Sequence, residues 1–255
     1  MTTVVPAGPP IMKASEVPDK NGVNMLLIAH PKVGKTTFLA SAQDSPYGRN
    51  VLVLDCAGDA GVRSISHRSD VDVLRIMRWE QMQKAYDWLL TGTHEYRTIG
   101  IDPLSSLQYL ARRDEIMPAS KTPLAPSYDD WNKLNWLTLT VVRDFKNLAS
   151  ERGWNVIITD WVKEEKDETL GRIVARPQCT PGVASQIGGS VDIVGHMYIN
   201  TTGDREIDFA PKFMGVSGKR EPGDQQLIPD KMVNPTMVEL LELVQPIQHA
   251  AKKGK

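Results

Sequence analysis

The sequence predicts an α/β fold in which a mostly parallel sheet is covered by helices on both faces. Short, wholly apolar runs alternate with segments of helical periodicity, as expected for parallel strands that are buried on both sides. A turn containing glycine and lysine follows the first apolar run. The last apolar runs are joined by a tight turn, which predicts an antiparallel C-terminal extension of the sheet.

The apolar runs place the predicted strands along the chain. We expect strands at residues 23–29, 51–54, 71–76, 98–101, 156–159, 193–199 and 206–210, and helices at 36–42 and 235–244. A further helix carries Met82, Ala85, Trp88 and Leu89 on one face. Residues 118–129 are predicted to be a long loop, and 162–177 a charged hairpin or mobile loop that turns at Gly171.

The longest predicted helix has a clear apolar stripe. Its members recur at spacings of three, four and seven: Trp131, Leu134, Val141, Phe145 and Leu148. Gly153 is expected to end this helix. The chain then divides into an irregular N-terminal arm at 1–22, one domain at 23–246 and a basic flexible tail at 247–255.

Composition excludes several classes of protein. The 255 residues include 30 Lys and Arg against 31 Asp and Glu, and 41% are hydrophobic. These values exclude a collagenous, strongly disordered or histone-like chain, and any basic surface must be local. Cys56 and Cys179 cannot form a disulfide framework and lie in no zinc-like cluster, so we expect no structural metal. No secretory signal or membrane-spanning run is visible, so we expect a cytoplasmic protein without a membrane partner.

The first turn carries the most informative motif. Residues 29–37 read Ala-His-Pro-Lys-Val-Gly-Lys-Thr-Thr, which fits the phosphate-loop pattern G-x-x-x-x-G-K-[ST] except at Ala29. We expect Lys35 to reach the β- and γ-phosphates of ATP and Thr36 to bind Mg²⁺ through its hydroxyl. The remaining loop positions that we expect to contact the nucleotide are His30, Pro31, Lys32, Val33, Gly34 and Thr37. Ala29 is expected to restrict a position where glycine can take positive φ.

Two carboxylates follow apolar strands and could complete this site. Asp102 ends the run at 98–101, and we interpret it as the Walker B aspartate that holds Mg²⁺ directly or through water. Its alternative role is to cap the helix that follows. Asp55 ends the run at 51–54, and either Asp55 or Asp59 could polarise the attacking water. Asp55 could instead only cap a turn between a strand and a loop.

The order of these features resembles that of the RecA-like P-loop ATPases. The nearest group comprises the short phage-encoded, AAA-type nucleotide-binding proteins related to single-strand annealing recombinases. Further matching segments are 128–131 (YDDW), 181–186 (PGVASQ), 191–194 (VDIV) and parts of 218–236. The resemblance covers about residues 12–240. RecA-like proteins usually carry D-x-E at the second strand, whereas this chain has Asp55-Cys56-Ala57.

The resemblance implies a function and partners. It implies a Mg²⁺-dependent ATPase that acts on single-stranded DNA in phage recombination or replication, in the host cytoplasm, with ATP bound between subunits of a homo-oligomer. Arg220 could act as an arginine finger on a neighbouring subunit's ATP, or Lys219 and Arg220 could be a solvated pair.

The resemblance also places DNA-facing loops at 114–130 and 162–190. Residues there that could contact DNA are Lys121, Tyr128, Trp131, Lys163, Lys166, Arg172 and Arg176. Neighbouring carboxylates favour a solvated hairpin tip, and Trp131 fits better as the start of its helix's core stripe.

Two other functions are also compatible with the sequence. Ala29 and Ala57, which stand where glycine and glutamate are expected, are compatible with a nucleotide-gated DNA- or protein-binding module that has little ATPase activity. A small-molecule kinase would use the same loop, but it would need a basic lid, and the segment at 162–177 is rich in acidic residues.

Overall fold

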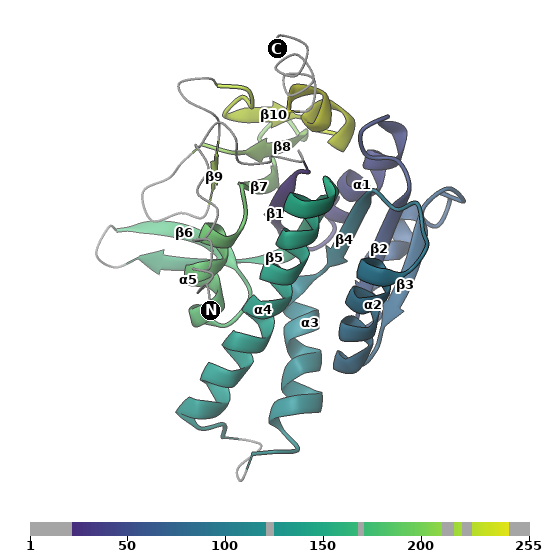
Figure 1. Cartoon of the computed structure of the whole chain (residues 1–255). Coiled ribbons are helices and arrows are strands. Elements are labelled where there is room, and N and C mark those ends of the chain that lie inside the picture. Colours follow the sequence, from purple (N-terminus) through teal and green to yellow (C-terminus); the bar gives the residue numbers. More distant parts are fainter. Residues whose placement is uncertain (1–21, 121–124, 168–170, 211–216, 221–225, 245–255) are drawn as a thin grey trace, which may run out of the picture.

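A computed structural model describes residues 22–120, 125–167, 171–210, 217–220 and 226–244 (Figure 1). The predicted arm (except Gly22), the basic tail and Lys121 therefore lie outside the described residues. The strands are β1 (Asn24–Ala29), β2 (Val51–Cys56), β3 (Asp72–Ile76), β4 (Thr98–Asp102), β5 (Asn155–Asp167), β6 (Arg172–Pro177), β7 (Ile193–Ile199), β8 (Arg205–Asp208), β9 (Gly218–Lys219) and β10 (Lys231–Val233).

The helices separate most of these strands. They are α1 (Lys35–Ala40), α2 (Trp79–Thr91), α3 (Leu104–Ala111), α4 (Tyr128–Arg152) and α5 (Pro181–Ser190). Short 3₁₀ segments span Ser41–Asp44 and Ala60–Ile65, and a π-helical segment spans Arg112–Ile116. Residues 237–244 are also helical, close to the predicted C-terminal helix. None of the helices in the described ranges combines the length and apolar character needed to span a membrane.

The sheet has the predicted mixed topology. Its order is β10-β8-β7-β1-β5-β4-β2-β3, with β6 paired to β5 and β9 paired to β7. All pairs from β7 to β3 along this order are parallel, whereas β8, β9 and β10 pair antiparallel. The strand β5 lies between β1 and β4. A residue at the end of β4 must therefore reach past β5 to meet the loop that follows β1.

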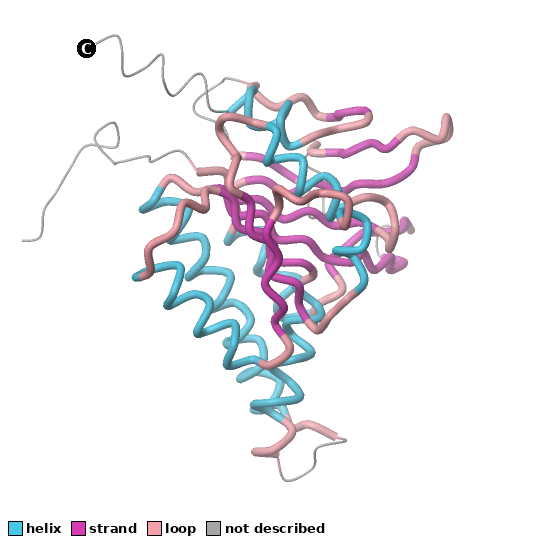
Figure 2. Tube along the Cα trace, turned by 90° about the vertical axis from the view of Figure 1, so that its right-hand side faces the viewer, coloured by secondary structure: helices cyan, strands magenta, loops and turns pink. Residues whose placement is uncertain are grey.

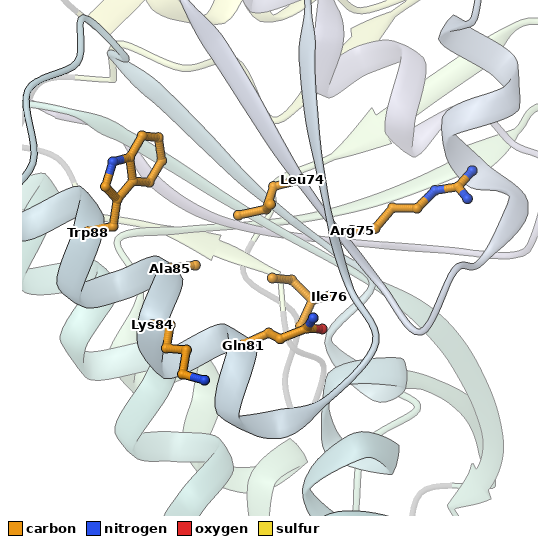
Figure 3. A pocket seen from close by; sticks show the side chains of 7 residues that line it. All are labelled: Leu74, Arg75, Ile76, Gln81, Lys84, Ala85 and Trp88. Atoms are coloured by element: carbon orange, nitrogen blue, oxygen red, sulfur yellow. The ribbon is translucent and has the colours of Figure 1, made fainter.

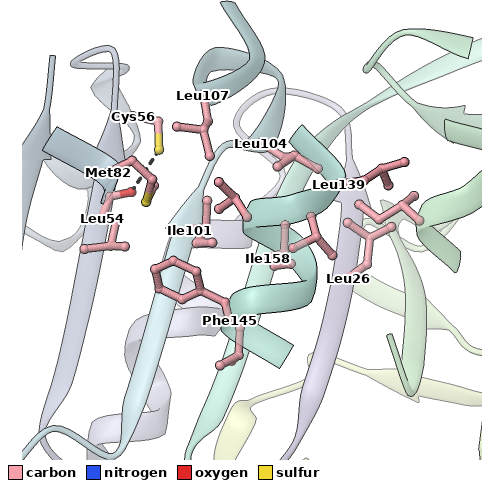
Figure 4. Close-up of a cluster of buried hydrophobic side chains, with 14 of the residues drawn as sticks. Leu26, Leu54, Cys56, Met82, Ile101, Leu104, Leu107, Leu139, Phe145 and Ile158 are labelled. Carbon is pink, nitrogen blue, oxygen red and sulfur yellow. Dashed lines mark hydrogen bonds between the residues drawn. The ribbon is translucent and has the colours of Figure 1, made fainter. Parts of the chain in front are cut away.

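Helices cover both faces of the sheet, so the central strands β1, β2 and β4 are buried along their whole length. On one face, Leu26 and Ile158 pack with Leu104 of α3 and Phe145 of α4 (Figure 4). On the other face, residues of the opposite pleat pack against α1 and the helix at 237–244. Figure 2 shows the layer of helices beside the sheet, and α3 and α4 extend together beyond the sheet.

The long helix α4 begins earlier than predicted because its first turn is capped. The Ser127 side chain accepts a hydrogen bond from the Asp130 backbone N–H at 3.2 Å, and Asp130 accepts one from the Ser127 backbone N–H at 2.8 Å. This reciprocal cap starts the helix at Tyr128, inside the predicted loop. The predicted end at Gly153 is confirmed, since Gly153 has a φ of 70°.

One residue of the predicted apolar face of α2 is not buried. Trp88 shares this face with Met82, Ala85 and Leu89, but its relative exposure is 41%. Its ring lies 5.2 Å from that of His94 and 5.9 Å from that of Tyr96, measured between centroids. The helical stripe therefore buries Met82, Ala85 and Leu89 but leaves Trp88 at its edge, against the half-buried rings of His94 and Tyr96.

The charged segment at 162–177 forms a hairpin, which is one of the two predicted options. Strands β5 and β6 pair antiparallel from Val162 opposite Pro177 to Asp167 opposite Arg172. Gly171, at the turn, has a φ of 62°, which is in the left-handed region that favours glycine. The hairpin lies at one side of the molecule in Figure 1.

Candidate active site at the phosphate loop

The phosphate loop leaves β1 without strain at Ala29. This residue is the last of β1 and pairs with Trp161 on one side and Met197 on the other. The left-handed positions of the loop are Lys32, with a φ of 68°, and Gly34, with a φ of 118°. The expected restriction at Ala29 is therefore wrong, because the loop does not require glycine's conformational freedom there.

Lys35 is buried beneath the loop. Its Nζ donates hydrogen bonds to the carbonyls of Ala29 at 3.0 Å and His30 at 3.1 Å. Burial lowers the pKa of Lys35, and the carboxylates of Asp102 and Asp160 act in the opposite direction. The ammonium group is thus held at the loop by backbone oxygens, with carboxylates nearby.

Thr36 and Asp102 meet as the motif predicts. The Thr36 hydroxyl donates to Asp102 Oδ2 at 2.6 Å, and Thr159 of the intervening β5 donates to Asp102 Oδ1. Both Thr36 and Asp102 are buried. The alternative role of Asp102 as a side-chain cap is wrong, since Pro103 precedes α3 and no side-chain cap is made.

The Thr36–Asp102 pair fits a magnesium ion by its chemistry. A hydroxyl and a carboxylate are oxygen ligands of the kind that Mg²⁺ prefers, with water completing its shell. A Cβ at Gly61 would lie 2.8 Å from Thr36 Oγ1 and 3.2 Å from Asp102 Oδ2, so only a glycine leaves this corner open. Within the described residues there is no group of three or more His, Cys, Asp or Glu side chains that could hold a metal.

Asp55 lies beside Asp102, at the same end of the parallel sheet. It pairs in register with Asp102, and its side chain is only 2% exposed. Its Oδ2 accepts no hydrogen bond from the described residues, and the nearest cation is Arg75 Nε at 3.7 Å. Burial raises the pKa of Asp55 to about 6, Asp102 and Asp59 act in the same direction, and Arg75 opposes them. A carboxylate with such a pKa is suited to accept a proton.

Asp59 occupies the loop that covers the site. Its carboxylate accepts a hydrogen bond from the Ser106 hydroxyl at the start of α3. The loop turns sharply before it, since Ala57 and Gly58 have φ values of 60° and 68°. Asp59 is therefore fastened to α3, whereas Asp55 keeps an oxygen without a hydrogen bond in the described part of the chain.

Two site residues that no motif predicted, Thr159 and Asp160, lie within β5, where its apolar run ends. Thr159 bonds Asp102, and Asp160 accepts from the Ser105 backbone N–H at 3.0 Å and from Cys179 Sγ at 3.1 Å. Asp160 is fully buried, and burial raises its pKa. A signal was available, because polar residues that end an apolar run are the same pattern that identified Asp102.

Arg205 is the third missed residue, and no motif marks it. Its Nε donates to the Val33 carbonyl of the phosphate loop at 2.9 Å. A Cβ at Gly34 would lie 2.9 Å from the same Nε. This guanidinium comes from β8, 172 positions along the chain from Val33.

The other predicted site residues have diverse positions. Pro31, Lys32 and Thr37 are exposed and Val33 is buried, while His30 Nε2 lies 3.3 Å from Glu164 of the hairpin. Arg220 is 57% exposed, and it bonds Asp192 at 3.1 Å and the Gly189 carbonyl at 2.8 Å. Lys219 is not a solvated residue, because its side chain is 8% exposed and its Nζ bonds the Ile228 carbonyl and Asp230.

A separate pocket of about 360 Å³ lies between β3 and α2. It is lined by Leu74, Arg75, Ile76, Gln81, Lys84, Ala85 and Trp88. Figure 3 shows that the Arg75 side chain extends to the opposite side of the strand from Leu74 and Ile76. The guanidinium of Arg75 therefore lies beside Asp55 and not in the interior of this pocket.

The comparison with known families agrees with this geometry. A family model described as an AAA domain matches residues 21–220, which include the phosphate loop, Asp55 and Asp102. No curated protein matches the chain.

Proposed function

Because the chain belongs to the AAA domain family of P-loop ATPases, we propose that it is a Mg²⁺-dependent ATPase that acts on single-stranded DNA. The observation that carries the nucleotide part of this proposal is the contact between Thr36 and Asp102, with Lys35 held beneath the same loop. These residues come from separate parts of the sequence and meet where a phosphate-loop ATPase needs a hydroxyl, a carboxylate and a cation.

The roles of the site residues follow from their positions. Lys35 would bind the β- and γ-phosphates, and Thr36 with Asp102 would hold Mg²⁺, which would neutralise phosphate charge. Asp55 would accept a proton from the attacking water, because it is buried, has a raised pKa and keeps one oxygen without a hydrogen bond among the described residues. Asp59 is the weaker candidate for this role, since Ser106 engages its carboxylate.

A module that binds ATP but hardly hydrolyses it is the second candidate. Ala57 stands where RecA-like ATPases usually carry a glutamate, and the only basic side chain contacting Asp55 among the described residues is Arg75, at 3.7 Å. Such a module would use the bound nucleotide to control its partner. Turnover no higher than that of Lys35→Ala would support this candidate, and clear turnover would exclude it.

The DNA part of the proposal is supported by aromatic side chains on α3 and α4. Tyr109, Tyr128 and Trp136 are 55%, 79% and 62% exposed, and the Arg113 guanidinium lies 5.9 Å from the Tyr109 ring centroid. Aromatic faces beside guanidinium groups suit unpaired bases and their phosphates. Trp131 is partly buried against the core and lies 5.2 Å from Arg112, so it is a poorer candidate for stacking.

The biological setting is proposed from the resemblance to phage-encoded recombination ATPases. We place the protein in recombination or replication, as a homo-oligomer with ATP between its subunits. In that arrangement Arg220 would reach the nucleotide of a neighbour. Its 57% exposure and its anchoring by Asp192 and Gly189 are compatible with such a role.

The direct test is ATP hydrolysis with and without an oligo(dT) strand. We expect Mg²⁺-dependent turnover that rises with the strand, and a loss of about 100-fold or more in Lys35→Ala and Asp102→Ala. Lys84→Ala is the control, because it removes an exposed lysine from α2, away from the loop. Turnover that persists in Lys35→Ala would overturn the ATPase assignment, and turnover indifferent to the strand would overturn only the DNA part.

A further inference from the structure

The antiparallel extension of the sheet supplies a side chain to the phosphate loop. Arg205 begins β8, and its Nε donates to the Val33 carbonyl at 2.9 Å. The contact lies at the turn that precedes Lys35, where Gly34 has a φ of 118°. A Cβ at Gly34 would lie 2.9 Å from Nε, 3.3 Å from Cδ and 3.4 Å from Cζ of Arg205. The guanidinium thus packs directly on the backbone of this turn.

The backbone of Arg205 is fixed from the far side. Its N–H donates to Asn234 Oδ1 at 3.2 Å, and its carbonyl accepts from the Asn234 N–H at 2.6 Å. The Asn234 amide also donates to Asp204 at 3.0 Å. Asn234 itself has a φ of 47°, so it holds an uncommon conformation while making these three contacts. The backbone of Arg205 is therefore held in place by hydrogen bonds to Asn234 while its side chain contacts the phosphate loop.

The turn before Arg205 is equally well bonded. The side-chain oxygen of Asn200 accepts from the backbone N–H groups of Thr202 and Asp204, at 3.0 and 2.9 Å, and from the Thr202 hydroxyl at 2.7 Å. Asparagine and threonine side chains commonly close turns in this way, and here the bonds order Asp204, the residue before Arg205.

We propose that Arg205 is a positioning residue that holds the phosphate loop in its nucleotide-binding shape, an inference that rests on the proposed function. By fixing the Val33 carbonyl it fixes the peptide unit between Val33 and Gly34, whose N–H is one of the loop donors. It also keeps a positive charge beside the loop, which favours an anionic ligand. The extension β8–β10 is then part of the nucleotide site and not a passive edge of the sheet.

Arg205→Met tests this proposal, because methionine keeps much of the side-chain length but removes the donor and the charge. We expect its Kd for Mg²⁺-ATP, measured by titration calorimetry, to rise about 10-fold, the size expected for one lost charge-assisted hydrogen bond. Arg205→Lys should recover part of this loss, since its ammonium group can donate to the same carbonyl. We expect KM to change more than kcat, because Arg205 acts through the loop.

Two companion variants separate positioning from general stability. Asn234→Gly tolerates the positive φ but removes the side chain that anchors Arg205, and it should raise the Kd in the same direction. Lys231→Met removes a cation that pairs with Glu206 in the same extension, and it should leave the Kd unchanged. The midpoint of thermal unfolding without nucleotide, measured for every variant, shows whether any loss of binding reflects unfolding.

The outcomes distinguish this inference from the proposed function. If wild-type protein and Lys35→Ala bind ATP equally weakly, the proposed function fails. If the wild type binds ATP, Lys35→Ala does not, and Arg205→Met binds like the wild type, the positioning role of Arg205 is overturned while the function stands. An equal loss of ATP affinity in folded Lys231→Met would also overturn the positioning role, because any cation of the extension would then support ATP binding.

Discussion

At the scale of single residues, the fold changes the chemistry of Asp55. The carboxylate ends a buried strand beside Asp102, so it loses most of its contact with water and gains a like charge. Both effects penalise ionisation, which raises the pKa to about 6 even though Arg75 lies 3.7 Å away. The same environment that suits Asp55 to accept a proton therefore makes it a source of instability at neutral pH.

This residue predicts how stability depends on pH. The folded protein holds a proton on Asp55 up to about pH 6, whereas an unfolded chain releases it near pH 4, so stability should fall as pH rises from about 4 to about 6. Asp55→Asn should abolish this fall and should be more stable than the wild type at pH 7.5. Thermal unfolding without Mg²⁺ or nucleotide measures the effect.

Asp70→Asn is the control for this prediction. The pKa of Asp70 is lowered by Arg68, so its contribution is present at neutral pH and is lost as pH decreases, which is the opposite sign. A wild type and an Asp55→Asn variant with the same pH profile would contradict the environment described for Asp55.

At the scale of elements, the position of α1 decides the geometry of the phosphate site. This helix carries Thr36 and packs on the sheet through Leu39, which is fully buried. Gly100 of β4 lies directly beneath it, and a Cβ there would be 2.2 Å from Leu39 Cδ2. The absence of a side chain at residue 100 therefore allows the helix to approach β4, the strand that bears Asp102.

Gly100→Ala should consequently destabilise the protein by about 1–3 kcal/mol through overpacking. It should also weaken ATP binding, because α1 must move away from Asp102. Chemical denaturation measures the first effect and calorimetry the second. The double variant Gly100→Ala with Leu39→Ala should lose clearly less stability than the sum of the two single variants, since Leu39→Ala removes the clash.

Gly189→Ala is the matched control for this prediction. Nothing lies within 4 Å of a Cβ at this position of α5, so the change should be neutral or slightly stabilising. Strict additivity of Gly100→Ala and Leu39→Ala would show that the two positions do not meet as described.

At the scale of the whole molecule, the proposed assembly places Arg220 and Lys35 of different subunits at one nucleotide. Arg220 is exposed, and its side chain bonds Gly189 and Asp192 near the C-terminal end of α5. Lys35, in contrast, is buried beneath the phosphate loop of its own subunit. A defect in Arg220 and a defect in Lys35 can therefore be placed in different chains, which are then mixed.

Mixing Arg220→Ala with Lys35→Ala tests this arrangement. Each variant alone should lose most of its ATPase activity. The mixture should recover activity, because sites that pair an intact loop with an intact Arg220 form only between the two variants. Arg220→Ala should still bind ATP, which calorimetry can verify. If mixing restores nothing although both variants assemble, Arg220 does not act across a subunit boundary.

Much of the fold could be predicted from the sequence because its signals are local. Continuous apolar runs indicated strands buried on both faces, and the stripe from Leu134 to Leu148 indicated the long helix. The motif at residues 30–37 and the strand that ends in Asp102 identified two contacting parts of the site. Trp88 was misplaced because helical spacing gives the direction of a side chain but not where the covering layer ends.

The rest was decided by tertiary structure, for a physical reason. Local sequence patterns were enough to show which residue types follow each apolar run and to locate the phosphate-loop motif. The strand order, with β5 between β1 and β4, became visible only in the folded chain, and it brings Thr159 to Asp102 and buries Asp160. It also brought Arg205 onto Val33 across 172 positions. Such contacts depend on strand order and packing, which no local pattern of side chains encodes.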